Sequence, residues 1–267
     1  MPAFRDVRAL TKTARRDFRK LLPQVFHRTF QGQFPFDLGN LPELGSTMQV
    51  FTPPFAVFDV TQNNQYDDSQ NDSFALPGIG HVVNKFHGSL DEDTSILNGI
   101  FGLDGLASVQ NRAGCGFNFT VPTRGRLRII TELQHLSTRV TMSLEDNFGF
   151  SSGVLLASSN IYVNLIRGQN VIELTQTMVG HTLESEGDDV SAVLPAPDIN
   201  TPFIFDVITE ETFETGADIQ IVAGCKFSSG TSLDDMKATV DAFLWHQIKR
   251  IAVDVIPGPP GPVGKKS

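Results

Sequence analysis

Apolar and polar residues alternate with a period of two along the middle of the chain. Residues 126–133 place Leu127, Ile129 and Leu133 on one side and charged residues on the other, and residues 139–145 repeat the pattern. Successive side chains of a β-strand point to opposite faces of its sheet. The alternation therefore predicts a sheet with one buried face and one solvated face.

Similar runs elsewhere predict further strands. We expect strands near 115–121, 126–133, 138–145, 154–165, 170–177, 202–208 and 217–227. Residues 48–61 predict an edge strand or two short pieces, because Pro53 and Pro54 cannot donate hydrogen bonds to a ladder. The polar stretch 63–73, the Gly-rich stretch 88–114 and the acidic stretch 183–197 are expected to be loops or irregular structure.

The stretch 233–255 is compatible with two structures. Its apolar residues alternate with polar ones, and the alternation changes phase near Lys249, as a β-bulge would require. The alternative is a helix, because Ser232 and Asp235 have the spacing of a capping box and apolar residues follow at helical steps. We favour a long final strand with a bulge.

These elements predict an all-β fold. We expect a two-sheet antiparallel β-sandwich with jelly-roll-like topology, preceded by an N-terminal amphipathic helix. The expected organisation is an arm over 1–30, a linker over 31–47, the sandwich over 48–256 and a Pro/Gly-rich tail over 257–267. The side chains expected in the core are Phe117, Phe119, Leu127, Ile129, Leu133, Val140, Met142, Leu144, Phe203, Phe205, Val207, Ile219 and Ile221.

The arm is predicted from apolar residues that recur at three- and four-residue steps over 3–26. Basic residues fill the positions between them, and Pro23 is expected to end the regular helix. The arm residues that we expect to act in assembly are Arg5, Arg8, Lys12, Arg15, Arg16, Phe18, Arg19 and Lys20. The alternatives are a terminal helix that is simply packed or solvated, and an arm for a membrane surface, a transit signal or nucleic acid.

Charge divides the chain into two parts. Residues 1–28 hold eight Lys and Arg against two Asp, a net of +6, whereas the rest holds thirteen against twenty-eight Asp and Glu, a net of −15. Phosphate binding needs basic surface, so nucleic acid is not expected on the acidic body. An anionic surface is a candidate partner for the arm alone, and attraction between arm and body favours a homo-oligomer.

Composition also limits the compartment. No stretch reaches 18 apolar residues, so no transmembrane segment is expected. The basic N-terminus is not followed by the apolar region and cleavage site of a secretory signal. These observations favour a cytoplasmic protein or a component of an assembled particle.

Catalytic motifs are weak. Residues 149–153 match G-x-S-x-G, but strands are predicted on both sides, where the nucleophile elbow needs a strand and then a helix. We therefore expect Ser151 and Ser152 to be turn residues, and no catalytic residue is assigned. The six His form no recognised metal-ligand spacing.

Acidic loops supply the only metal candidates. Carboxylate-rich loops of β-sandwiches can bind calcium, although none here follows the D-x-D-x-D-G pattern. The candidate ligands are Asp67, Asp68, Asp72, Asp91 and Asp93. Solvated loop charge is the favoured interpretation, so we expect no cofactor, with calcium as the one candidate.

Aromatic and thiol side chains complete the candidate chemistry. Phe supplies 21 of the aromatic residues, and the remaining ones, which could stack on a sugar, are Tyr66, Tyr162 and Trp245. Cys115 and Cys225 are expected as buried free thiols, and a disulfide between them is the alternative.

The sequence favours a non-enzymatic structural or self-assembling protein that uses its basic arm against its acidic body. The alternative is a carbohydrate- or ligand-binding β-sandwich with calcium-stabilised loops. A glycan-active enzyme ranks third, because no pair of carboxylates is recognisable as catalytic.

Overall fold

The computed structural model describes residues 48–91, 106–147, 151–196 and 202–257. The expected arm, the linker, nearly all of the tail, and Asp93 lie outside these ranges. Every regular element of the described part is a β-strand, so the all-β prediction is confirmed there.

Thirteen strands make up this part of the chain. They are β1 Gln49–Phe51, β2 Val57–Asn64, β3 Asp68–Asn71, β4 Phe74–Leu76, β5 His81–Asp91, β6 Leu106–Thr120, β7 Gly125–Asp146, β8 Ser152–Arg167, β9 Asn170–Ser185, β10 Val190–Val193, β11 Phe203–Ile208, β12 Asp218–Asp234 and β13 Met236–Pro257.

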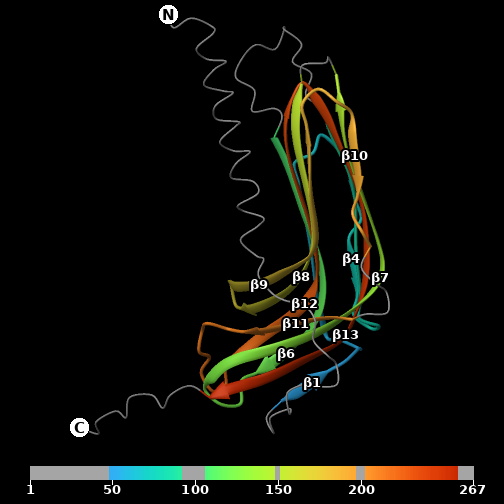
Figure 1. Ribbon diagram of the computed structural model, residues 1–267. Helices are drawn as coiled ribbons and strands as arrows, with labels where there is room; N and C mark the ends of the chain where they lie inside the picture. The colour runs from blue at the N-terminus through green and yellow to red at the C-terminus, as the bar shows by residue number, and fades with distance from the viewer. Residues whose placement is uncertain (1–47, 92–105, 148–150, 197–201, 258–267) are drawn as a thin grey trace, which may run out of the picture.

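The strands form two antiparallel sheets. Sheet A has the order β10-β7-β13-β5-β3, with β11 also on β7, β1 also on β13 and β4 also on β5. Sheet B has the order β2-β6-β12-β8-β9. Figure 1 shows the long strands of the two sheets as two layers that follow each other closely along most of their length.

One hydrophobic core lies between the sheets and draws side chains from both. Eleven of the thirteen predicted core residues are buried, and Phe203 and Val207 are half-buried against the same core. Both exceptions lie on β11, which pairs only with β7 at one edge of sheet A. An edge strand has a neighbour on one side only, so its side chains remain more exposed.

Strand β7 corrects one prediction. Two strands were expected over 126–133 and 138–145, but one continuous strand spans both. The register against β13 moves from Trp245–Ser137 to His246–His135, so Leu136 is an extra residue. This bulge changes the phase of the inward side chains, and the phase change resembles a strand break in the sequence.

Strand β13 confirms the bulged final strand over the helical alternative. Ile248 pairs with Leu133 and Arg250 pairs with Glu132, which leaves Lys249 as the extra residue. Of the two residues expected at the start of a helix, Ser232 instead lies in β12, and Asp235 forms the tight connection from β12 to β13 with a φ of 59°. An Asp tolerates this left-handed conformation better than most residues.

Three expected loops contain strands. The polar stretch 63–73 includes the end of β2 and all of β3, and β3 pairs with β5 at the edge of sheet A, where polar side chains meet solvent. The Gly-rich stretch 88–114 includes the end of β5 and the first half of β6. The stretch 183–197 includes the end of β9 and all of β10. The short edge strands carry too few apolar residues to show a periodicity.

Candidate functional site

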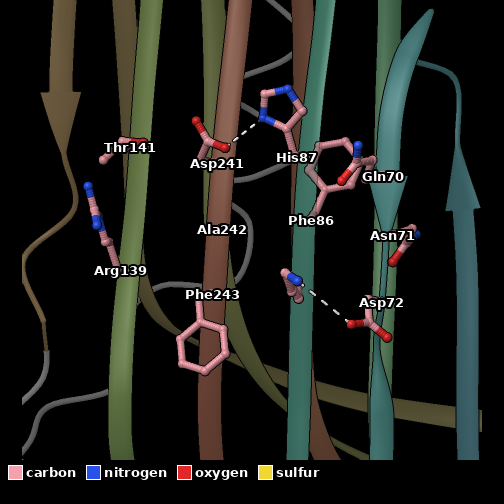
Figure 2. Close-up of a pocket in the computed structure, with 11 residues that line it drawn as sticks. Gln70, Asn71, Asp72, Phe86, His87, Arg139, Thr141, Asp241, Ala242 and Phe243 are labelled. Carbon is pink, nitrogen blue, oxygen red and sulfur yellow. Dashed lines mark hydrogen bonds and ion pairs between the residues drawn. The ribbon is translucent and has the colours of Figure 1, made fainter.

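The outward face of sheet A carries an open depression of about 590 Å³. Its lining comes from four neighbouring strands, β3, β5, β13 and β7, and from Asp72 directly after β3 (Figure 2). Alternation along each strand places Lys85, His87, Arg139, Asp241 and Phe243 on the outward face, because their sequence neighbours on β5, β7 and β13 are in the core.

Charged groups line this depression in pairs. The ring of His87 lies 2.6 Å from the Asp241 carboxylate, and the Lys85 ammonium lies 3.7 Å from Asp72. Both pairs are well exposed, so each contributes little to stability. Within the described residues Arg139 forms no ion pair, which leaves its guanidinium available to an oxygen-rich ligand.

Two partly exposed aromatic rings extend this face along β13. Phe243 and Trp245 are 36% and 37% exposed and point to the same side of the sheet. The Trp245 indole N–H donates to His81 Nδ1 at 3.2 Å, and the two rings meet edge to face. Burial, with Lys249 nearby, lowers the pKa of His81, which favours the neutral ring that accepts this hydrogen bond.

Trp245 is thus the one predicted sugar-stacking residue that the structure leaves accessible. Tyr66 and Tyr162 are buried, which corrects the prediction for both, because neither ring offers a free face. Tyr66 Oη lies 2.9 Å from Ser229 Oγ inside the sandwich. Phe243 was missed, although the alternation of β13 already placed it beside Trp245 on the polar side.

The outward face of sheet B has a different chemistry. Arg112 Nε lies 2.9 Å from the Asp59 carboxylate, and Glu173 bridges Arg112 at 2.9 Å and Lys226 at 2.8 Å. These four groups come from β2, β6, β12 and β9, so one network crosses the sheet. Because its side chains are partly buried and linked to one another, the network stabilises the sheet more than isolated surface ion pairs would.

Tyr162 lies on this face beside the network. A Cβ on Gly114 would come within 2.4 Å of the Tyr162 hydroxyl, so only glycine leaves room for the ring there. Burial, followed by the charge of Asp59, raises the pKa of Tyr162. Its hydroxyl is buried without a hydrogen-bond partner. Tyr162 is therefore part of the packing of sheet B.

The acidic candidates for a metal do not converge in the described part of the chain. Asp67, Asp68, Asp72 and Asp91 are all exposed, and no group of three or more His, Cys, Asp or Glu among the described residues is placed to hold a metal ion. Asp72 instead pairs with Lys85, and Asp91 accepts a hydrogen bond from Asn147 at 3.1 Å.

Of the serine motif, the described residues 151–153 lie at the start of β8. Strand β7 belongs to sheet A and β8 to sheet B, so these two strands are not paired as a hairpin. Ser151 is buried and its hydroxyl donates to the Asp146 carboxylate, while Ser152 begins β8.

The two cysteines are free thiols. They lie in the core on the adjacent strands β6 and β12, where Cys115 is level with Ala223 and Cys225 with Ala113. Burial raises the pKa of each thiol to about 12, so both stay protonated near neutral pH.

A buried histidine pair was not anticipated from the sequence. His135 Nδ1 lies 3.3 Å from His246 Nε2 in the interior, beside the bulge at Leu136. Burial, and then the neighbouring His135, lowers the pKa of His246 to about 3. Burial also lowers the pKa of His135. Both rings are therefore neutral at pH 7.

The arm residues lie outside the described ranges. Within those ranges, no helix has the length and apolar character to span a membrane.

Comparison with known proteins assigns no family. No protein-family model matches the chain, and no curated protein matches its sequence. Several solved structures give partial structural matches, and three of them follow. An isomalto-dextranase of Arthrobacter globiformis T6, solved with panose, is 13% identical with a TM-score of 0.23, over 78% of this chain and 23% of that one.

The other two matches are equally distant. TmCBM61, solved with β-1,4-galactotriose, is 10% identical with a TM-score of 0.16, over 72% of this chain and 88% of that one. Infectious bursal disease virus, Gx strain, gives 10% identity and a TM-score of 0.20, over 86% of this chain and 47% of the viral chain. The chain thus spans less than half the length of the dextranase and viral chains, and none of these likenesses assigns a function.

Proposed function

We propose that this chain is a non-enzymatic structural protein that self-assembles through its basic N-terminal arm and its acidic β-sandwich body. The proposal requires no cofactor. The observation that carries it is the separation of charge along the chain, with a basic N-terminal segment and an acidic remainder.

Charge supports the same function. The first 28 residues have a net charge of +6 and the rest of the chain −15, so an arm from one copy is attracted to the body of another. The Debye length is about 8 Å at physiological salt, so this attraction orients the partners while apolar contact supplies most of the binding energy.

A jelly-roll-like topology is part of the proposal. The chain crosses between sheets A and B at the connections β1–β2, β2–β3, β5–β6, β6–β7, β7–β8, β9–β10, β11–β12 and β12–β13. Repeated crossing between two packed sheets is the connectivity that distinguishes such sandwiches from stacked meanders.

The test compares the full chain with a variant that lacks residues 1–30. We expect static light scattering to give an oligomer for the full chain and a smaller, folded species for the deletion, and we expect the mass of the full chain to depend on salt. Circular dichroism controls for folding of the shortened body. Equal masses and equal salt responses for the two proteins would refute the assembly function.

A second candidate function is carbohydrate binding on the outward face of sheet A. It is favoured by Phe243 and Trp245, which expose two rings side by side next to Arg139, His87 and Asp241. Aromatic rings next to hydrogen-bonding groups are the combination that recognises the apolar faces and hydroxyls of sugars.

Trp245 reports on this site directly, because it is the only tryptophan in the chain. Titration with a neutral oligosaccharide such as galactotriose should change its fluorescence, and the change should be lost in Phe243→Ala, which retains the reporter. Leu76→Ala, on exposed β4 at the edge of sheet A, is the matched control. An unchanged spectrum across a panel of linear oligosaccharides would exclude this candidate.

A further inference from the structure

The register of sheet A arranges its outward face in rows that cross the strands. Residues that pair across antiparallel strands point to the same face, so each row brings neighbouring side chains together. From the β3–β4 edge toward β7, three successive rows are Gln70, His87, Asp241 and Thr141; Asp72, Lys85, Phe243 and Arg139; and Phe74, Val83, Trp245 and Ser137. The first two rows line the depression, and the third continues the exposed face beyond it.

The third row adds an aromatic ring to the two on β13. Phe74 is 40% exposed, and the buried Val83 forms a low floor between Phe74 and Trp245. Phe74 lies two strands from Trp245, a backbone separation of about 10 Å, and Phe243 lies two residues from it along β13, about 7 Å. These separations are comparable to one or two units of an extended sugar chain, so the three rings can stack on one oligosaccharide.

The Trp245 ring is held in place before any ligand binds. Its indole N–H donates to His81 Nδ1 at 3.2 Å, and the two rings meet edge to face with their centres 5.5 Å apart. A ring that is already fixed loses little conformational freedom on binding, so more of the stacking energy appears as affinity.

The depression beside these rings contains a cation without a partner. The ring of His87 lies 2.6 Å from Asp241, and the Lys85 ammonium lies 3.7 Å from Asp72, so each carboxylate of the lining has a neighbouring donor. Of the charged side chains in the lining, Arg139 alone forms no ion pair with a described residue. Its guanidinium is exposed and can bind an anionic group.

We propose that the outward face of sheet A binds a linear oligosaccharide of β-1,4-linked uronate units, with sugar rings stacked on the aromatic side chains and a carboxylate on Arg139. This inference rests on the second candidate function, carbohydrate binding, and names its ligand class. Arg139 pairs directly with Phe243 across β7 and β13 (Figure 2). A sugar stacked on Phe243 therefore directs an equatorial carboxylate at its edge toward the guanidinium, which can bind it through two parallel hydrogen bonds.

The acidic body makes these local cations decisive. Outside its first 28 residues the chain has a net charge of −15, which repels anionic ligands from most of the surface. Lys85 and Arg139 lie on either side of Phe243 and offset that field at this position. The attraction is screened by salt, because the Debye length is about 8 Å at physiological ionic strength.

Titration followed by Trp245 fluorescence and by calorimetry tests the ligand class. The probes are a tetramer of β-1,4-linked glucuronate and cellotetraose, the matched neutral chain with a hydroxymethyl group in place of each carboxylate. At low salt the acidic tetramer should bind about tenfold more tightly, and the difference should shrink at high salt. Arg139→Gln should remove the difference and Arg139→Lys should restore part of it, whereas the control Arg167→Gln, at the exposed end of β8, should change neither affinity.

Chain length tests the third ring. Phe74→Ala should weaken binding of the acidic tetramer about fivefold but leave the acidic dimer nearly unchanged, because two sugar units do not reach from the depression to β4. Circular dichroism controls for folding of the variant. Equal losses for the dimer and the tetramer, or no loss for either, would contradict the platform of three rings.

The outcomes separate this inference from the function on which it rests. If the two tetramers bind equally and Arg139→Gln changes neither affinity, carbohydrate binding stands and the acidic ligand class is refuted. If tetraglutamate binds as tightly as the acidic tetramer, the face binds chains of carboxylates without recognising the sugar, and the inference is also refuted. If neither tetramer binds, the inference fails, and the panel of linear oligosaccharides decides whether carbohydrate binding itself stands.

Discussion

Lowering the pH from 7 to 5 should destabilise the folded body through the buried pair His135 and His246. The two rings lie 5.1 Å apart, centre to centre, and both are almost completely inaccessible. Burial lowers the pKa of His246 from 6.5 to about 3, and burial also lowers the pKa of His135. Between pH 6.5 and about 3, His246 therefore stays neutral in the folded protein but is protonated in the unfolded chain.

The sign and size of the effect follow from linkage. Above pH 6.5 neither state carries the proton, so the stability contribution is fully present there; it is lost as the pH falls toward about 3, the pKa in the folded state. Each pH unit corresponds to about 1.4 kcal/mol, so His246 alone should cost about 2 kcal/mol at pH 5 and about 5 kcal/mol at pH 3. His135 adds to the loss in the same direction.

Urea denaturation at pH 7, 6 and 5, followed by Trp245 fluorescence at one protein concentration, measures this loss. His246→Leu removes one titrating group, so its free energy of unfolding should depend less on pH even if its stability at pH 7 differs. The matched control is His181→Gln on the exposed part of β9, which keeps the buried pair and should keep its pH dependence. Equal stability of the native chain at pH 7 and 5, or an equal slope in His246→Leu, would refute the reasoning.

Three further results are expected from the packing. Tyr66→Phe should lower the free energy of unfolding by about 1 kcal/mol because it removes the hydrogen bond to a core serine, whereas Tyr162→Phe should be neutral or stabilising because its buried hydroxyl has no partner; equal effects in chemical denaturation would contradict this. Phe227→Ala should cost about 3–5 kcal/mol in the same assay, since the ring is fully buried, and a loss below about 1 kcal/mol would contradict its place in the core. Neither cysteine should react with a disulfide reagent at pH 8 until denaturant is added, and reaction of the native protein would contradict their burial.

The sequence predicted the regular parts of the sandwich because one face of each long strand is buried. Leu127, Ile129 and Leu133 alternate cleanly, and the structure places all three in the core. The bulge at Lys249 was also predictable, because it shifts the inward phase of an otherwise regular pattern. The bulge at Leu136 produced a similar shift but was interpreted as a break between two strands, since a phase change does not say whether the chain continues.

The outward faces were harder to predict. Alternation shows which side chains point away from the core, but it does not show whether neighbouring groups cover them. Tyr162 illustrates the limit, because it occupies an outward position on β8 and is nevertheless buried beside Gly114 and the ion-pair network. Trp245 occupies an outward position on β13 and remains accessible. Cross-strand neighbours decide between these outcomes, and strand order is not contained in any single strand's sequence.

The difference between the two outer faces makes the two candidate functions compatible. An arm that docks anywhere other than the outward face of sheet A would leave the rings on β13 open to solvent. Assembly would then present many copies of the sheet A face, and weak binding at each would gain strength from multivalency. It follows that the fluorescence of Trp245 should be the same in the full chain and in the chain without residues 1–30. A change in its emission on removal of the arm would place the arm on sheet A, and the two functions would then compete for one surface.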